Sequence, residues 1–221
     1  MKPWLIAAIV LASACTYKIN FSASGLAGDG NLKAESRPPE AFSAVESSGA
    51  FEIALSAGEG PPKLELRGDA NLLPHVRTRF EGGVLKVDSD QDLSPNHPLV
   101  VTAHTTKLEK VTLSGAGKVQ VLGLHGQSFA LNLSGAAHAR LAGDVSSTTF
   151  DISGAGTIDA AELVATDVQV QVSGAGKASV YCTGKLKVGI SGAGKVTYAG
   201  KPKAIEKSIS GVGVLRAEEE K

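Results

Sequence analysis

The chain has 221 residues, of which 43% are hydrophobic and 5% are aromatic, and 26 of them are glycine. Its 22 lysine and arginine residues balance its 22 aspartate and glutamate residues. The neutral balance gives no basis for binding nucleic acid or a strongly anionic membrane, and the composition favours a β architecture with many tight turns.

The first residues predict an export signal. "MKPWLIAAIVLASAC" places Lys2 before an apolar run from Trp4 to about Ala12, with small residues leading to Cys15. A charged start, a short apolar run and a small-residue cleavage site define a secretory signal. The run is shorter than the roughly 20 apolar residues that a membrane-spanning helix needs. We therefore assign residues 1–14 to a signal peptide and exclude them from the fold.

Cys15 is the predicted site of lipid attachment. "LASAC" resembles a bacterial lipobox, in which small residues precede the cysteine that becomes the lipidated first residue. Thr16 stands where the inner-membrane retention signal has Asp, so the resemblance implies the outer membrane, on its periplasmic or its surface side. Ordinary cleavage after Ala14 is the alternative and would give a soluble secreted or periplasmic protein. The polar residues 15–41 are expected to form a flexible tether.

Residues 42–110 predict the irregular first coils of a β structure. "FSAVESSGAFEIALSAGEGPPKLELRG" indicates three strands, and "EGG" at 81–83 indicates a turn before a strand at 84–87. "HPLVVTAHTTKLEKVTLSG" indicates one further strand that leads into the repeats. A solenoid needs atypical end coils to cover its open end, so we expect no separate domain here.

One short sequence recurs through the rest of the chain. "SGAGK" begins at Ser114, Ser173 and Ser191, and variants begin at Ser134 (SGAAH), Ser153 (SGAGT) and Ser210 (SGVGV). The steps between them are 20, 19, 20, 18 and 19 residues. Apolar and polar residues alternate on both sides of each copy, which is typical of strands. A period near 20 is typical of a solenoid.

The repeats predict an all-β fold, a single-stranded right-handed parallel β-helix with about 19–20 residues per coil. The domain is expected over 42–217, with regular repeats over 111–217. Each pentapeptide is then a corner, where glycine permits positive φ and close backbone approach. At the third position, which holds alanine in most copies, we expect a larger side chain to collide with the equivalent residue of the next coil.

The pentapeptide matches neither a nucleotide loop nor a calcium loop. A phosphate loop needs Gly-Lys followed by Ser or Thr and then a helix, whereas Val119, Ala178 and Val196 follow the three lysines. Calcium β-rolls need an Asp ligand and a nine-residue period. No cofactor or metal site is therefore predicted.

Enzymatic and binding alternatives rest on few residues. The acidic residues fall in different registers and the histidines are not at ligand spacing, so no catalytic residue is assigned, although β-helices do host carbohydrate-active enzymes. Cys182 is expected to be a buried small hydrophobic residue, with a reactive thiol as the alternative.

The fifth residues of the successive corners form a column of Lys118, His138, Thr157, Lys177 and Lys195. This column indicates either a basic ridge for an anionic glycan or lipid headgroup, or a solvated corner.

Four motifs resemble one bacterial family. They are "FSAVESSGAFEI" at 42–53, "NLLPHV" at 71–76, "EGGVLKV" at 81–87 and the repeated "LSGAGKV" type of sequence, together covering about residues 40–215. The chain is similar to the family known as "putative autotransporter adhesin, head GIN domain". The resemblance implies a right-handed β-helix in the bacterial cell envelope, secreted or lipid-anchored, and it brings no catalytic residue.

Together these features favour a non-enzymatic cell-envelope lipoprotein that presents an adhesin-like binding module. Its expected partners are the membrane, through the lipid, and an unidentified envelope protein or glycan. A structural component of the envelope without its own ligand is the second hypothesis, and a carbohydrate-active enzyme is the third.

Overall fold

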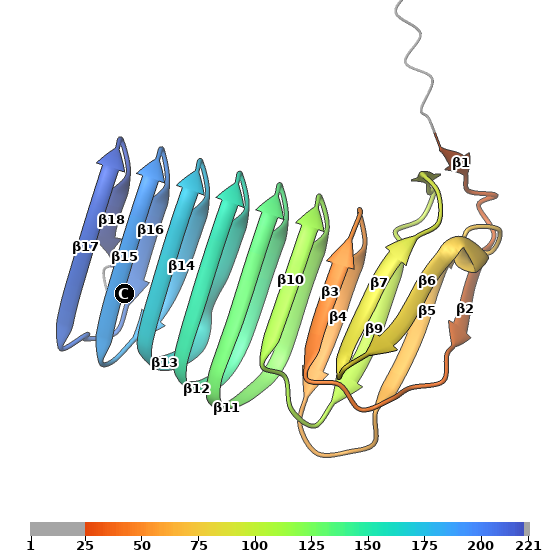
Figure 1. Ribbon diagram of the computed structural model, residues 1–221, viewed down its shortest axis with the longest axis horizontal. Helices are drawn as coiled ribbons and strands as arrows, with labels where there is room; N and C mark the ends of the chain where they lie inside the picture. The colour runs from red at the N-terminus through yellow and green to blue at the C-terminus, as the bar shows by residue number, and fades with distance from the viewer. Residues whose placement is uncertain (1–24, 219–221) are drawn as a thin grey trace, which may run out of the picture.

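The computed structural model describes residues 25–218 (Figure 1). The signal peptide predicted at 1–14 and the lipid-attachment residue Cys15 lie outside the described residues. The described chain is almost entirely β, with one 3-10 turn, η1 (Leu73–His75). Among these residues no helix has the length and apolar character needed to cross a membrane. The all-β prediction is confirmed.

The repeats form a β-solenoid. Its strands are β10 (Lys110–Gly115), β11 (Lys118–Gly135), β12 (His138–Gly154), β13 (Thr157–Gly174), β14 (Lys177–Cys182), β15 (Lys185–Gly192), β16 (Lys195–Ala199), β17 (Ala204–Gly211) and β18 (Val214–Ala217). Equivalent strands of successive coils pair in parallel, and serines of successive corners are register partners, such as Ser114 with Ser134. The parallel stacking predicted from the period is confirmed.

Each coil is flattened into two faces. We call the strands that lead into the corner the entry sheet and the strands that leave it the exit sheet. In β11, β12 and β13 one long strand crosses from the exit sheet to the entry sheet, with a register irregularity at the bend between them. In Figure 1 the near, entry-sheet strands run upward and the coils advance to the left, which is the sense of a right-handed helix.

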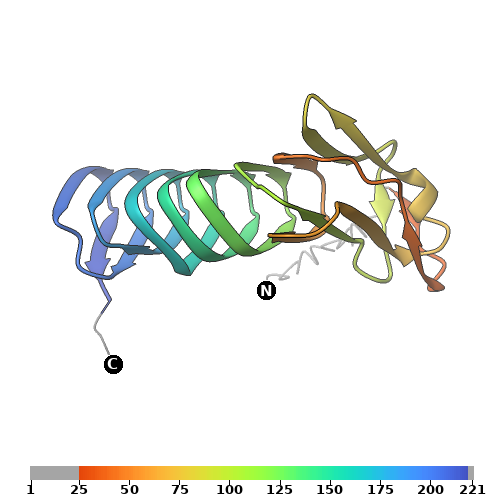
Figure 2. The same ribbon diagram turned by 90° about the horizontal axis from the view of Figure 1, so that it is seen from below.

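An insertion of residues 58–109 separates the first coil from the second in the sequence. β3 (Ala44–Ser48) and β4 (Glu52–Ala57) make this coil, pairing in parallel with β10 and β11. The intervening residues 58–109 contain β5 (Lys63–Asp69), η1, β6 (Val76–Glu81), β7 (Val84–Ser89), β8 (Leu93–Ser94) and β9 (Val100–Thr105). They cover the N-terminal end of the solenoid (Figures 1 and 2).

This covering segment continues both sheets. β7 pairs with β3 and forms a hairpin with β6, which extends the entry sheet. β9 pairs with β4, and β5 pairs antiparallel with β9, which extends the exit sheet. Sixteen strands are thereby joined in one hydrogen-bonded sheet.

The chain preceding residue 42 is more ordered than the tether prediction of 15–41 implies. β2 (Leu32–Ser36) pairs antiparallel with β5, and β1 (Leu26–Ala27) pairs with β8. Arg37 then donates hydrogen bonds from its guanidinium to the carbonyl oxygens of Val76 (2.6 Å) and Leu73 (2.9 Å). The prediction is wrong for residues 25–37. β2 is an edge strand whose side chains are mostly exposed, so its polar sequence looks like a linker.

The core is a set of stacked apolar columns. In the entry sheet one column consists of Val111, Leu131, Phe150, Val170 and Val188, and none of them is more than 1% exposed. Phe129 and Phe150 are the largest fully buried side chains. Lys207 continues this column in the last coil, where β17 has no strand on its outer edge within the described residues.

The corners depend on the second and fourth residues of the pentapeptide. The glycines at the second position have φ between 107° and 123°. From Gly115 onward, a Cβ there would lie 2.5–2.7 Å from the carbonyl oxygen of the equivalent glycine one coil earlier. The fourth position faces the core, where a Cβ on Gly176 would lie 2.6 Å from Ile152.

The third position of the corner is open, contrary to the expected collision. Ala116, Ala136, Ala155, Ala175 and Ala193 are exposed, and Val212 at the same position is 78% exposed. The side chain there points away from the stacked backbone, so alanine is not required for packing. The spatial constraint falls instead on the glycines at the second position and on the small residues at the fourth position, which include the buried Ala137.

Candidate functional site

In the corners from Ser134 onward, the backbone N–H groups of the third and fifth residues are already hydrogen-bonded. The third residue donates its N–H to the glycine carbonyl one coil earlier, as from Ala136 to Gly115 at 3.0 Å. The fifth residue does the same, as from Lys177 to Gly156 at 2.9 Å. Because stacking consumes these groups, the corner differs from a phosphate-binding loop, whose N–H groups point at the ligand.

The lysine column predicted at the corner exit is assembled, but its charges are divided. Lys118, His138, Thr157, Lys177 and Lys195 are successive register partners in the exit sheet. Lys118 forms an ion pair with Glu52 at 2.8 Å. Lys177 and Lys195 form no ion pair within residues 25–218 and are direct neighbours, so positive charge is concentrated at the C-terminal end of the column.

No acidic or histidine cluster with the geometry of a metal centre is found among the described residues. No group of three or more His, Cys, Asp or Glu side chains converges there. Asp151 lies in the entry sheet and Asp159 in the exit sheet. Asp167 accepts a hydrogen bond from the Lys185 N–H at 2.8 Å, and Glu162 pairs with Arg140 at 2.7 Å.

One serine–histidine contact resembles part of a catalytic triad. Ser56 Oγ lies 2.8 Å from Nδ1 of His104, on neighbouring parallel strands. Within residues 25–218 no carboxylate bonds the other ring nitrogen of His104. The pair therefore lacks the third group that orients a catalytic histidine, and it is accounted for as a cross-strand hydrogen bond.

Cys182 has the structural role that its sequence context predicts. Its side chain is fully buried, and its Sγ donates a hydrogen bond to the Thr166 carbonyl at 3.3 Å. Burial raises the pKa of the thiol above its ordinary value. A higher pKa keeps the thiol protonated and unreactive at neutral pH.

A hollow of about 770 Å³ lies on the outer face of the entry sheet. We call it the entry-face trough and define it by two rows of outward residues that cross successive coils. The first row is Thr112, Asn132, Asp151, Gln171, Gly189 and Ser208. The second row is Ser134, Ser153, Ser173, Ser191 and Ser210, the first letters of the corners.

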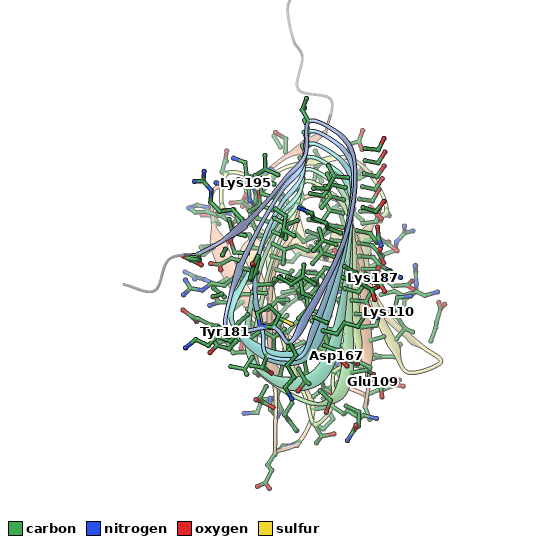
Figure 3. All side chains as sticks on the ribbon, turned by 90° about the vertical axis from the view of Figure 1, so that its left-hand side faces the viewer. Glu109, Lys110, Asp167, Tyr181, Lys187 and Lys195 are labelled. Carbon is green, nitrogen blue, oxygen red and sulfur yellow. The ribbon has the colours of Figure 1, made fainter. Side chains whose placement is uncertain are left out.

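The trough follows the solenoid axis, because each row takes one residue from each coil. Figure 3 looks along this axis and places Lys187 and Lys110 on the entry face, opposite Lys195 and Tyr181 on the exit face. Lys187 and Lys110 stand in the next outward column, two residues before the first row. Smaller hollows beside Thr149 and Ser48 lie on the same face.

The polar side chains of the trough have no protein partners within residues 25–218. None of the side chains in the two rows makes a side-chain hydrogen bond or an ion pair there. On the exit face, by contrast, Ser179 bonds Thr197 at 2.9 Å and Arg140 bonds Glu162. The donors and acceptors of the trough are therefore available to water or to a ligand.

The charges lining the trough are balanced. They are the carboxylates of Asp151 and Glu206 and the ammonium group of Lys187, whereas Lys207 occupies a core position. Glu206 also pairs with Lys185 at 2.7 Å, and the hydrogen bond from Lys185 holds the pKa of Glu206 below its ordinary value. A shallow surface whose charges are compensated does not select for a highly charged ligand.

The sequence carries a signal for this trough, at other positions than the column of Lys118, Lys177 and Lys195. The signal is the pair of positions at the serine and two residues before it, which are polar in nearly every repeat. Alternation alone marks these positions as outward-facing. That the entry face is hollowed, and that its side chains do not pair with one another, depends on three-dimensional packing.

Comparison with known proteins assigns the chain to a family. A model of the family described as "Putative auto-transporter adhesin, head GIN domain" matches residues 41–202. The chain belongs to this family. No curated protein matches the chain in a sequence search.

Solved structures share the head GIN fold. A putative adhesin from Bacteroides fragilis aligns with a TM-score of 0.66 at 19% identity, covering 88% of this chain and 100% of that one. A putative adhesin from Parabacteroides merdae aligns with a TM-score of 0.56 at 19% identity, covering 89% and 100%. A protein from Parabacteroides distasonis named as a putative lipid binding protein aligns at 0.58 and 19%, covering 88% and 99%. At these identities the likeness shows the fold alone.

Proposed function

We propose that this head GIN protein is a non-enzymatic, adhesin-like binding module, anchored by a lipid on Cys15 and facing the periplasm or the cell exterior from the outer membrane. The observation that carries the binding role is the entry-face trough, which presents unpaired polar side chains from successive coils. Membership of a family named for adhesion agrees with a binding role and a cell-envelope location.

A rigid row of identical backbone units suits an extended partner. Stacked coils fix the trough side chains at the spacing of neighbouring strands, about 4.8 Å. The partner can therefore make the same kind of contact several times, and the separate contacts reinforce one another. The adhesin name of the solved relatives supports this proposal only as an analogy.

The binding role is tested by two matched double variants of the full chain. Asp151→Ala with Gln171→Ala removes the carboxylate and amide from the trough, and Gln120→Ala with Asp159→Ala removes the same two groups from the exit face. We expect the first variant to lose at least about tenfold in retention on isolated cell envelopes, equivalent to about 1.4 kcal/mol. The second should bind as the wild type does.

Equal retention by both variants would contradict the proposal and favour a structural component without its own ligand. Circular dichroism and thermal melting of all proteins provide the folding control. All four substituted side chains point away from the core, so we expect melting temperatures close to that of the wild type.

The lipid anchor is tested by Cys15→Ala, with Cys182→Ala as the matched control. We expect palmitate labelling and membrane partitioning of the wild type and of Cys182→Ala, because the Cys182 thiol is buried inside the solenoid. Cys15→Ala should be unlabelled and soluble. Unchanged partitioning of Cys15→Ala would remove the anchor from the proposal while leaving the binding test intact.

A further inference from the structure

The trough itself indicates what kind of molecule it binds. Its two rows offer hydroxyl, amide and carboxylate groups in every coil from β10 to β17, except where Gly189 interrupts the first row. The hydroxyl and amide groups both donate and accept hydrogen bonds, and the carboxylate accepts them. A ligand that satisfies them must also carry donors and acceptors at regular intervals along a straight line.

Gly189 creates a distinct place within the first row. A Cβ at this position would collide with the side-chain amide of Gln171, so the Gln171 side chain lies over the glycine. The amide thus replaces the missing side chain of the next coil and keeps the row polar. It is also held low against the sheet, which leaves the trough open above it.

The charge balance limits the chemistry of the ligand. The carboxylates of Asp151 and Glu206 are compensated by the ammonium groups of Lys187 and of Lys185, the ion-pair partner of Glu206, so neither a polyanion nor a polycation gains a net electrostatic attraction there. The apolar side chains of the same strands, such as Ile152 and Val172, are buried in the core. The exposed lining of the trough nevertheless contains more apolar than polar surface, so its ligand must offer apolar faces as well as hydrogen-bonding groups.

We propose that the entry-face trough binds a straight, uncharged polysaccharide, of the β-1,4-linked type, lying parallel to the solenoid axis. Each sugar of such a chain carries several hydroxyl groups and advances by nearly the spacing of stacked strands, about 4.8 Å. One sugar can then face one coil. This inference rests on the proposed function, because it names the ligand class of the same trough.

The absence of aromatic side chains among the trough residues sets the expected strength of binding. Without a stacking platform, each sugar is held by hydrogen bonds that compete with water and give a small net gain. A single sugar should bind very weakly. Affinity should rise with each added sugar until the rows are filled, at roughly five units, because five stacked strands span roughly 20 Å.

The test uses the full chain carrying Cys15→Ala and β-1,4-linked glucose and N-acetylglucosamine oligomers of increasing length. Binding is followed by calorimetry, and by affinity electrophoresis with the corresponding polymers. We expect affinity for at least one series to rise severalfold with each added unit, to level off near five units and to change little between low and high salt. A branched or α-linked glucan of equal size should bind at least tenfold more weakly.

Trough variants locate the binding. Asp151→Ala with Gln171→Ala should lose at least tenfold in affinity, and Gln120→Ala with Asp159→Ala should lose none. Gly189→Ser should also weaken binding, because its side chain displaces the Gln171 amide. Gly189 does not have a positive φ, so we expect serine to fit its backbone conformation without strain. Thermal melting verifies that this variant folds.

Three outcomes would overturn the inference. Affinity could be independent of oligomer length, fall steeply with salt, or be absent for both series. If neither series binds while the trough variant still loses retention on cell envelopes, the ligand class is wrong and the binding role of the trough remains. Self-association through the entry face, abolished by the trough variant in sedimentation, would replace the glycan with a second copy of this chain.

Discussion

At the scale of single residues, the most constrained polar group is Asp69 at the end of β5. Its side chain is fully buried, and it accepts hydrogen bonds from the backbone N–H of Asn96 (2.7 Å), from the N–H of His97 (3.2 Å) and from His97 Nδ1 (2.8 Å). Gly28 packs so closely that a Cβ there would collide with the carboxylate. Asp69 thus fastens the loop at 95–98 to the end of β5 within the covering segment, and Gly28, between β1 and β2, packs against it.

Asp69 makes the stability of the covering segment dependent on pH. The hydrogen bond from the His97 side chain is the main cause that lowers the pKa of Asp69 below its ordinary value of 3.8. A carboxylate with a depressed folded-state pKa stabilises the fold above pH 3.8, and that contribution is lost as the pH falls through the folded-state value.

We expect Asp69→Ala to lower the melting temperature by several degrees at pH 7, because three hydrogen-bond donors lose their acceptor. It should also flatten the loss of stability between pH 4 and pH 2 relative to the wild type. Thermal melts across this range measure both effects. Asp144→Ala, which removes an exposed carboxylate, is the control, and an acid profile for Asp69→Ala identical to that of the wild type would contradict the assignment.

For single residues, the sequence could predict the role of the repeated glycines but not the contacts of residues outside the repeats. The recurring glycines predicted corners with positive φ, and the structure confirms this at every second position of the pentapeptide. The role expected for alanine at the third position was wrong, because a recurring small residue does not reveal which way its side chain points. Asp69 and His97 are 28 residues apart in sequence and belong to no repeat, so their contact had no periodic signal.

At the scale of elements, the two ends of the solenoid differ. The N-terminal end is covered by residues 58–109 and by β2. At the C-terminal end, among residues 25–218, β17 pairs only with β15. All its side chains are exposed, and Ile205 and Ile209 are 42% and 38% exposed. Unpaired edges with apolar side chains invite another strand to pair. Lys207 interrupts this surface with a charge at a core position.

We expect Lys207→Val to increase self-association. Valine restores the column of Val170 and Val188, and burying a valine side chain contributes about 1.5–3 kcal/mol. Association should tighten by roughly tenfold or more, since 1.4 kcal/mol corresponds to tenfold. Sedimentation velocity at several concentrations measures it. Lys201→Val, which places the same side chain in an exposed turn, is the control. A strictly monomeric Lys207→Val would contradict the view that the charge of Lys207 opposes association at this end.

The alternation of apolar and polar residues and the repeat period were enough to predict the regular strands, because the same pattern recurs at the same distance from each corner. They were not enough for β1 and β2, which were assigned to a tether. These strands are short, exposed and paired with strands remote in sequence. Their order comes from β5, β8 and the Arg37 side chain, and none of these partners is visible in the local sequence.

At the scale of the whole molecule, the solenoid is modular over its regular coils. Gly154 and Gly174 occupy equivalent corners and are register partners. Removing residues 155–174 joins Gly154 to Ala175 and leaves the neighbouring coils in register. Stability in such arrays is approximately the sum of the repeats and their interfaces.

We expect this one-coil deletion to fold with an unchanged β-type circular dichroism spectrum and a modestly lower melting temperature. It should also shorten the glycan length at which affinity levels off by about one sugar, because the trough loses one strand spacing of about 4.8 Å. Deleting residues 58–109 should instead give insoluble protein, because it uncovers the edges of β3 and β4. An insoluble one-coil deletion would contradict modularity.

The axial direction of the backbone hydrogen bonds has a mechanical consequence. Strands run across the long axis in Figure 1, so the bonds between coils lie nearly along it. Tension between an anchor before β1 and a partner held at the far coils would load these bonds in the opening direction, a few at a time. Coils would then separate one after another, and the molecule would lengthen under load before the whole solenoid unfolds.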